Sequence, residues 1–254
     1  MTHRYAAARK HYRHYRDTQA MAPTTREVRE HYARLSATYE RKANRACERA
    51  YVRLLARHFG GVQRVLELGS GTSGLLARLD APAKVACDLS PAMLRAGTWG
   101  THDRRVVADA QGLPFREARF DAVFCINLLE HVPEPKRVIE EAARVLEPGG
   151  RFLAVTPNGG VGRLLGLLER LHLKLPEGPC RFLTFKELAG LVSPRMNVVE
   201  HRFFLAFPVG HARFVERIDR LGPGPRGWGL FQYIVARRCG TGVKDGDKEP
   251  QNEG

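Results

Sequence analysis

The chain has 254 residues, 43% of them hydrophobic, which suffices for one α/β domain, and no stretch approaches the ~18 consecutive apolar residues of a membrane-spanning helix. Its five cysteines are odd in number and form no C-x-x-C pair, which argues against a disulfide framework and a metal site, and no secretory signal is recognisable, so we expect a cytoplasmic protein. The formal net charge of +14 would suit nucleic acid, an anionic membrane face or an acidic substrate, and the first 60 residues hold fourteen Lys or Arg against five Asp or Glu.

Two helices are expected before the main domain. Residues 1–22 are rich in His, Tyr and Arg without an apolar period, and we interpret them as a mobile basic arm. Thr25 can cap a first helix. The apolar positions of this helix recur at steps of three and four: Val28, Tyr32, Leu35 and Tyr39. A second helix is expected from about Asn44 to Phe59, ended by Gly60-Gly61. Residues 23–61 are therefore predicted to form a helical lid over one edge of the following sheet.

The stretch from Arg64 to Asp88 predicts a strand, a glycine turn, a helix and a second strand. The glycines of the turn are Gly69, Gly71 and Gly74, and the leucines at helical spacing after them are Leu75, Leu76 and Leu79. Glycines let the backbone approach a ligand, a helix start offers free N–H groups, and a carboxylate at the solvated tip of the second strand can accept both hydroxyls of a ribose. The unit predicts a nucleoside-containing cofactor, and the Gly-x-Gly-x-x-Gly spacing leaves a dinucleotide open.

The next two strands end in polar residues. Ser90-Pro91 is expected to start a helix that contains Met93. A third strand from about Arg105 to Ala108 ends at Asp109, which can accept a hydrogen bond from an exocyclic amine. A fourth strand, 120–126, is wholly apolar after its opening Phe-Asp and leads into Asn127, Glu130 and His131. Strands one and four should flank the point where strand order reverses, so these three residues are predicted to stand at a ligand-binding mouth.

The second half completes the predicted sheet. A helix is expected over about 135–146, a fifth strand over 151–156, and two further strands over 198–207 and 231–237. Thr184 can cap a helix from Phe185 to Leu191. Residues 157–183 and 208–229 are interpreted as insertions on the acceptor side of a domain spanning 62–239, and 240–254 as a disordered tail. Four apolar residues of the first insertion are candidates to line an apolar site: Leu164, Leu168, Leu171 and Phe182.

Five segments in order are similar to one enzyme family. They read ELGSGTSG, CDLSPAML, ADAQGLPF, FDAVFCINLLEHVP and VLEPGGRFL. This succession resembles the class I S-adenosylmethionine-dependent methyltransferases, and within them the group that includes the ubiquinone and menaquinone biosynthesis methyltransferases. The resemblance covers roughly Tyr32 to Asn158. It implies a Rossmann-like, seven-stranded, mostly parallel sheet with helices on both faces and an antiparallel final strand.

The resemblance also implies the residues that hold the cofactor, S-adenosyl-L-methionine. Glu67, Gly69 and Gly71, with Ser70 beside them, would hold its methionine end, and the Asn127 region would meet the amino-acid portion through its backbone. The nucleoside would be held by Asp88 at the ribose hydroxyls, by Leu89 and Met93 on the two faces of adenine, and by Asp109 and Ala110 at its edge. The negative charge of Glu67 itself favours a cationic methyl donor over a phosphate-bearing dinucleotide.

The activity expected is methyl transfer to a small, apolar or lipid-like acceptor, foremost at oxygen. His131 is the candidate general base, since a neutral imidazole can take a phenolic proton near pH 7. Glu130 and His131 together fall short of a metal ligand set. Two alternatives stay open: methylation of RNA, because of the net charge, and a non-catalytic cofactor-binding module. Contact with a membrane surface is a further partner hypothesis, and the sequence indicates neither the acceptor nor the oligomeric state.

Overall fold

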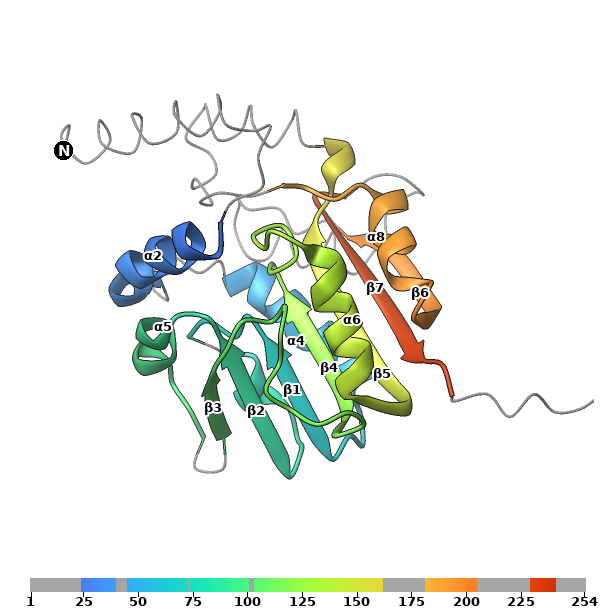
Figure 1. Ribbon diagram of the computed structural model, residues 1–254, viewed down its shortest axis with the longest axis horizontal. Helices are drawn as coiled ribbons and strands as arrows, with labels where there is room; N and C mark the ends of the chain where they lie inside the picture. Colours follow the sequence, from blue (N-terminus) through green and yellow to red (C-terminus); the bar gives the residue numbers. More distant parts are fainter. Residues whose placement is uncertain are drawn as a thin grey trace, which may run out of the picture.

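The computed structural model describes residues 24–39, 45–72, 74–100, 103–161, 181–204 and 229–240. Seven strands form one sheet in the order β3-β2-β1-β4-β5-β7-β6 (Figure 1). The strands are β1 (Arg64–Leu68), β2 (Ala83–Asp88), β3 (Asp103–Val107), β4 (Phe120–Ile126), β5 (Leu146–Pro157), β6 (Met196–Phe204) and β7 (Phe231–Arg238). All neighbours pair in parallel except β7, which runs antiparallel to both β5 and β6. The predicted mostly parallel sheet with an antiparallel final strand is therefore confirmed.

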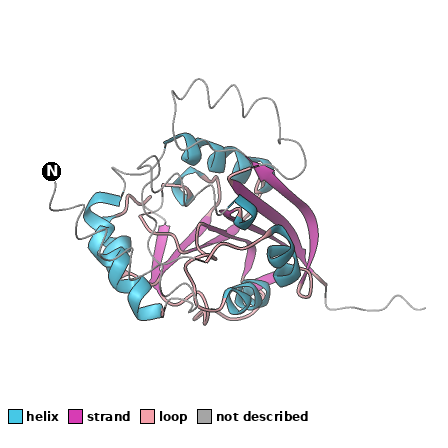
Figure 2. Ribbon diagram, turned by 90° about the horizontal axis from the view of Figure 1, so that it is seen from above, coloured by secondary structure: helices cyan, strands magenta, loops and turns pink. Residues whose placement is uncertain are grey.

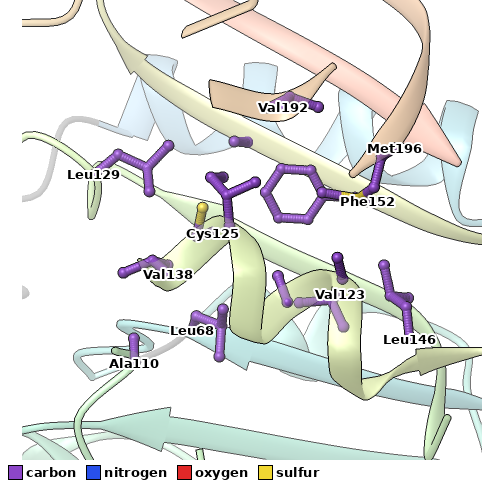
Figure 3. Packing of buried hydrophobic residues seen from close by; sticks show 14 of the residues in the cluster. Leu68, Ala110, Val123, Cys125, Leu129, Val138, Leu146, Phe152, Val192 and Met196 are labelled. Atoms are coloured by element: carbon purple, nitrogen blue, oxygen red, sulfur yellow. The ribbon is translucent and has the colours of Figure 1, made fainter. Parts of the chain in front are cut away.

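Helices cover both faces of the sheet (Figure 2). The described helices are α2 (Thr25–Leu35), α4 (Arg45–His58), α5 (Pro91–Ala96), α6 (Pro135–Val145) and α8 (Phe185–Val192), with 3₁₀ turns η1 (Ser36–Thr38), η2 (Leu76–Arg78) and η3 (Gly159–Val161). Helix α4 packs on one face and α6 and α8 on the other, whereas α2 lies beyond the strand ends (Figure 1). Side chains alternate along the strands, so Leu66 and Val123 face α6 and α8, whereas their neighbours Val65 and Phe124 face α4. Figure 3 shows the core on the α6 side, where β4 and β5 pack against Val138.

Local sequence signals explain where the helices begin. The hydroxyl of Thr184 accepts a hydrogen bond from the N–H of Glu187 and caps α8, and Ser90 caps α5 with Pro91 in the first turn, both as predicted. The prediction that Thr25 caps α2 is wrong by one residue. Thr24 is the N-cap, because Glu27 stands three positions after it and its carboxylate returns a hydrogen bond to the Thr24 N–H at 2.9 Å.

The predicted helix after the glycine turn is wrong as well. Among the residues described between Leu68 and Ala83, which leave out position 73, one 3₁₀ turn, η2, is the helical structure that forms. The chain must leave the end of β1, make the turn and return along the sheet to the start of β2 within residues 69–82. An α-helix rises only about 1.5 Å per residue, whereas extended chain covers about 3.3 Å, so too few residues remain for a helix of useful length. The apolar pattern holds nevertheless, because Leu76 and Leu79 are buried against the α4 face.

Several predictions fall outside the described residues. These are the mobile arm over 1–22, the candidate acceptor residues Leu164, Leu168 and Leu171, nearly all of the second insertion, and the tail after Gly240. The domain boundaries stay predictions. Within the part of the chain that the structure describes, none of the helices combines the length and the apolar character needed to cross a membrane.

Candidate functional site

A cavity lies where the carboxyl ends of β1, β2 and β4 meet, at the reversal of strand order between β1 and β4. Its walls come from the loops after these strands and from α2, which lies beyond the strand ends rather than against a sheet face (Figure 1). Of the predicted site residues, Gly69, Gly71, Asp88, Leu89, Met93, Asp109, Ala110, Asn127 and His131 line it. Sequence reasoning from separate strands thus converged on one cavity.

The glycine loop after β1 brings bare backbone to the cavity wall. Gly69 and Gly71 have φ angles of +66° and +57°, a region that favours glycine. A Cβ on Gly69 would lie 2.7 Å from the Leu128 side chain, so the close packing of this loop on the loop after β4 requires glycine there. The Gly71 N–H donates to Asp88 Oδ2 at 2.8 Å. The loop is therefore tied to the tip of β2.

Asp88 holds two loops through one carboxylate. Its Oδ1 accepts from the Ser90 N–H at 2.7 Å, while Oδ2 accepts from Gly71. Burial raises the pKa of this carboxyl, and the two N–H donors oppose that shift without cancelling it. The expectation of a solvated strand tip is wrong, because the glycine loop folds over the end of β2. A carboxylate has about four lone-pair sites, so two stay available to a ligand's hydroxyl groups.

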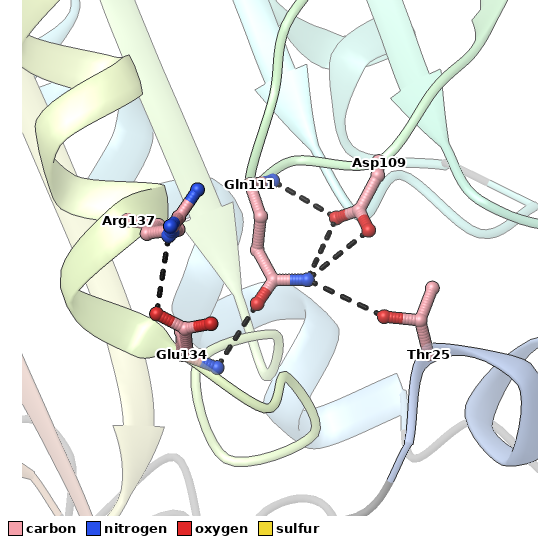
Figure 4. A network of polar contacts seen from close by, with 5 residues as sticks. All are labelled: Thr25, Asp109, Gln111, Glu134 and Arg137. Carbon is pink, nitrogen blue, oxygen red and sulfur yellow. Dashed lines mark hydrogen bonds and ion pairs between the residues drawn. The ribbon is translucent and has the colours of Figure 1, made fainter.

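A glutamine that sequence reasoning missed links three walls of the cavity. Gln111 Nε2 lies 3.1 Å from both oxygens of Asp109 and 3.5 Å from the Thr25 hydroxyl of α2, and its Oε1 accepts from the Glu134 N–H at 3.0 Å (Figure 4). Because Asp109 stands at the end of β3, this one side chain joins the β3 tip to α2 and to the start of α6. Its position two residues after Asp109 was the only signal in the sequence.

The tip of β4 has an unusual backbone. Asn127 adopts a φ of +52°, and its N–H donates to the Val155 carbonyl at 2.9 Å. Its side-chain Nδ2 donates to the Tyr51 hydroxyl of α4 at 3.3 Å. The Oδ1 atom is buried and has no hydrogen-bond partner among the described residues. Tyr51 is a second residue that sequence reasoning missed, since α4 was expected to belong to a lid and instead packs on a sheet face.

His131 lines the cavity with a buried acid behind it. The Glu130 carboxylate is fully buried, and its Oε2 accepts from the Thr156 hydroxyl at 3.0 Å. His131 Nε2 lies 4.0 Å from Glu130 Oε1, and the His131 ring meets the Tyr32 ring of α2 edge-on at 5.5 Å between centroids. Among the described residues, no group of three or more His, Cys, Asp or Glu could hold a metal ion.

Three predicted residues do not line this cavity. Glu67 is buried within β1, and by strand alternation it is on the same side as Val65, towards α4. Ser70, between Gly69 and Gly71, is buried, and its Oγ has no hydrogen-bond partner among the described residues. Phe182 packs against the core on the α4 side. A contact of these residues with cofactor or acceptor stays a prediction.

The cavity offers hydrogen-bond acceptors and apolar surface, and the Arg29 side chain of α2 also lines it. Two carboxylates, Asp88 and Asp109, and the orphaned oxygen of Asn127 suit a ligand rich in donors, such as a nucleoside that carries an ammonium group. A diphosphate would need free N–H groups or a helix start at the glycine loop. There the Gly71 N–H is already bonded to Asp88 and no α-helix follows. The residues therefore fit S-adenosylmethionine better than a dinucleotide.

Comparisons with known proteins agree with this fit. The family described as "Methyltransferase domain" matches residues 66–154. A ubiquinone biosynthesis O-methyltransferase of Burkholderia vietnamiensis is 30% identical over 200 residues, covering 72% of this chain and 81% of that protein. One from Xylella fastidiosa is 38% identical over 142 residues, which cover 51% of this chain and 57% of that protein. The match thus spans little more than half the length of this relative.

A solved structure shows the same fold. A SAM-dependent methyltransferase from Thermotoga maritima superposes with a TM-score of 0.63 at 19% identity, covering 83% of this chain and 99% of that one. Such identity supports the architecture alone, whereas the Burkholderia vietnamiensis protein is similar in sequence over most of its own length. The motif order, the cavity at the reversal point and these similarities agree: the chain belongs to the S-adenosylmethionine-dependent methyltransferase family.

Proposed function

We propose that this protein transfers the methyl group of S-adenosylmethionine to a hydroxyl oxygen of a small, apolar or lipid-like acceptor. The observation that carries the proposal is the position of His131, a potential base in the same cavity wall as the cofactor residues, with the Glu130 carboxylate 4.0 Å behind it. Oxygen as the methylated atom is supported by the name of the relatives, which are ubiquinone biosynthesis O-methyltransferases.

The residues proposed to hold the cofactor divide between its two ends. Asp88 would accept the ribose hydroxyls, Leu89 and Met93 would enclose adenine, and Asp109 with Ala110 would meet the adenine edge. Gly69, Gly71 and Asn127 would meet the methionine portion. When bound, the cofactor supplies an electrophilic methyl group on a cationic sulfur.

Helix α2 is proposed to close the cavity over both substrates. Val28 and Tyr32 of α2 line the cavity, together with Tyr39, which follows η1 and is 37% exposed. Apolar and aromatic groups there would exclude water from the reacting atoms and offer a surface to an apolar acceptor. These side chains would contribute by aligning the two substrates, because displacement at a methyl group depends above all on the geometry of the attacking oxygen, the methyl carbon and the sulfur.

His131 is proposed to take the proton of the acceptor hydroxyl. As the imidazole becomes cationic, the nearby Glu130 carboxylate stabilises the charge, and Thr156 holds that carboxylate in place. The base and its stabilising acid follow β4 directly, so their position relative to the cavity is set by a buried strand.

Methyl transfer to simple catechols tests the proposal. The purified chain would be incubated with S-adenosylmethionine labelled in its methyl group and with catechols that carry alkyl chains of increasing length. We expect label in a methoxy group, and faster transfer to longer chains. Cofactor binding without transfer to any hydroxylated compound would favour a non-catalytic module, and label in added RNA would favour the other alternative.

A further inference from the structure

The side chain of Asn127 leaves one acceptor unused beside the cavity. Its backbone is fixed, because it sits at a φ of +52° and its N–H donates to Val155. Its Nδ2 donates to Tyr51, and its buried Oδ1 has no hydrogen-bond partner among the described residues. Buried polar atoms in native proteins are nearly always hydrogen-bonded, so a missing partner next to a binding cavity points to a donor on the ligand.

Tyr51 holds the Asn127 amide from the α4 side of the sheet. Its ring is 7% exposed and meets Phe204 and Phe231 edge-on, at 6.1 and 6.3 Å between centroids. The ring therefore cannot swing away from the tip of β4 without opening the core on the α4 side. With one N–H of the Asn127 amide donated to the Tyr51 hydroxyl, the second N–H and the unpartnered Oδ1 stay available, and Oδ1 is the acceptor of the two.

The donors on S-adenosylmethionine are its ribose hydroxyls, its adenine amine and its α-ammonium. The first two have acceptors in Asp88 and Asp109, at the tips of β2 and β3, whereas Asn127 stands on the other side of β1, at the tip of β4. We propose that Tyr51 is a positioning residue whose hydroxyl turns the Asn127 amide so that Oδ1 accepts a hydrogen bond from the α-ammonium group. This inference rests on cofactor binding and adds a side-chain contact to the backbone contact that the family resemblance implies.

Removing one hydroxyl tests the inference without removing the ring. The Tyr51→Phe variant and the unaltered chain would be titrated by calorimetry with three compounds. S-adenosylmethionine has the amine and the carboxylate, its decarboxylated form has the amine alone, and methylthioadenosine has neither. Tyr233→Phe is the matched control, because Tyr233 also packs against Phe204 and its hydroxyl bonds to Glu200.

We expect Tyr51→Phe to weaken the binding of both amine-containing compounds about fivefold to tenfold. The affinity for methylthioadenosine should stay within about twofold of that of the unaltered chain. Tyr233→Phe should leave all three affinities unchanged. Asn127→Ala should reproduce the pattern of Tyr51→Phe, and the double variant should be no weaker than Asn127→Ala alone, because both changes remove one shared interaction.

Three results would overturn the inference. An equal loss of affinity for all three compounds in Tyr51→Phe would show that Tyr51 only supports the core. Weaker binding of S-adenosylmethionine but not of its decarboxylated form would show that the Asn127 amide is turned round, with Nδ2 donating to the ligand's carboxylate. If the unaltered chain bound none of the three compounds, the cofactor assignment itself would fail, which is distinguishable from a failure of the Tyr51 role alone.

Discussion

At the scale of single residues, the carboxyl of Asp88 serves both the fold and the proposed cofactor site. It fastens the glycine loop through Gly71 and the start of α5 through Ser90, in a place where burial raises its pKa. Raising the pKa of an acid means that folding disfavours its charged form. The contribution of Asp88 to the free energy of unfolding is therefore greatest at low pH. It is lost as the pH rises from the ordinary aspartate pKa to the raised pKa of the folded state.

The same residue predicts a pH dependence of cofactor binding. Ribose hydroxyls donate to the charged carboxylate, so the bound state favours ionised Asp88 and affinity should fall as pH drops through the raised pKa. The fall should begin at a higher pH than an ordinary aspartate pKa of about 3.9 would give. Calorimetry with S-adenosylhomocysteine from pH 4 to 8 measures it. In Asp88→Asn, binding should be weaker throughout and flat over this range, whereas an unaltered pH profile would assign the dependence to another group.

Loss of the His131 imidazole is predicted to lower turnover without weakening cofactor binding. If its imidazole takes the acceptor proton, His131→Ala should lower kcat by roughly a hundredfold, the usual contribution of a general base. Cofactor affinity should stay intact, because none of its proposed contacts is lost. Single-turnover methylation and a cofactor titration on the same preparation test both halves. Unchanged turnover would leave His131 the role of supporting Tyr32, which its ring contacts edge-on.

At the scale of elements, Gln111 connects α2 to the strand tips and gives a prediction about the proposed lid. Gln111→Ala removes the side-chain bonds to Asp109 and to the Glu134 N–H and, among the described residues, leaves Asp109 only the backbone N–H of residue 111, so its carboxylate is held less firmly and cofactor binding should weaken about threefold to tenfold. Gln111→Glu should be worse, because it places a second carboxylate against Asp109.

Calorimetry on both variants measures this effect. The control is Gln63→Ala near the start of β1, because in the described part of the chain the Gln63 side chain bonds only to the Gly61 carbonyl. If Gln111→Glu bound as well as the unaltered chain, Gln111 would not orient Asp109. Cofactor affinity unchanged in both Gln111 variants would contradict the link between α2 and the β3 tip.

The elements also show what the sequence could and could not predict. Strand tips were predictable, because parallel strands bring Asp88, Asp109 and Asn127 to one edge whatever lies between them. The absence of a helix after Gly74 was not predictable. Leucine spacing indicates which residues are buried, but not the distance that the chain has to span between two strands. Contacts between distant segments, such as Tyr51 with Asn127, leave no periodic signal in the sequence.

At the scale of the whole molecule, the cavity joins elements from both sides of the sheet. Its walls take residues from α2, from the loop after β1, from α5 and from the loop between β4 and α6. A ligand that binds there contacts several of these segments at once, and it binds the folded state only. Cofactor binding should therefore stabilise the whole domain by mass action and not only order a loop.

This coupling separates the methyl donor from a dinucleotide in one measurement. At a hundred times its Kd, S-adenosylhomocysteine should add about 2.7 kcal/mol to the free energy of unfolding. For a domain of this size that corresponds to a rise of roughly 5 to 10 °C in Tm. NAD at the same concentration should add nothing, because its diphosphate would meet the glycine loop, where the Gly71 N–H is already bonded to Asp88 and no helix start offers free N–H groups. The Asp88→Asn variant should lose most of the shift, since the loop and the ribose share that carboxylate. A larger rise with NAD than with S-adenosylhomocysteine would mean that the glycine loop rearranges into a phosphate site, and the assignment of the cavity to a sulfonium cofactor would then fail.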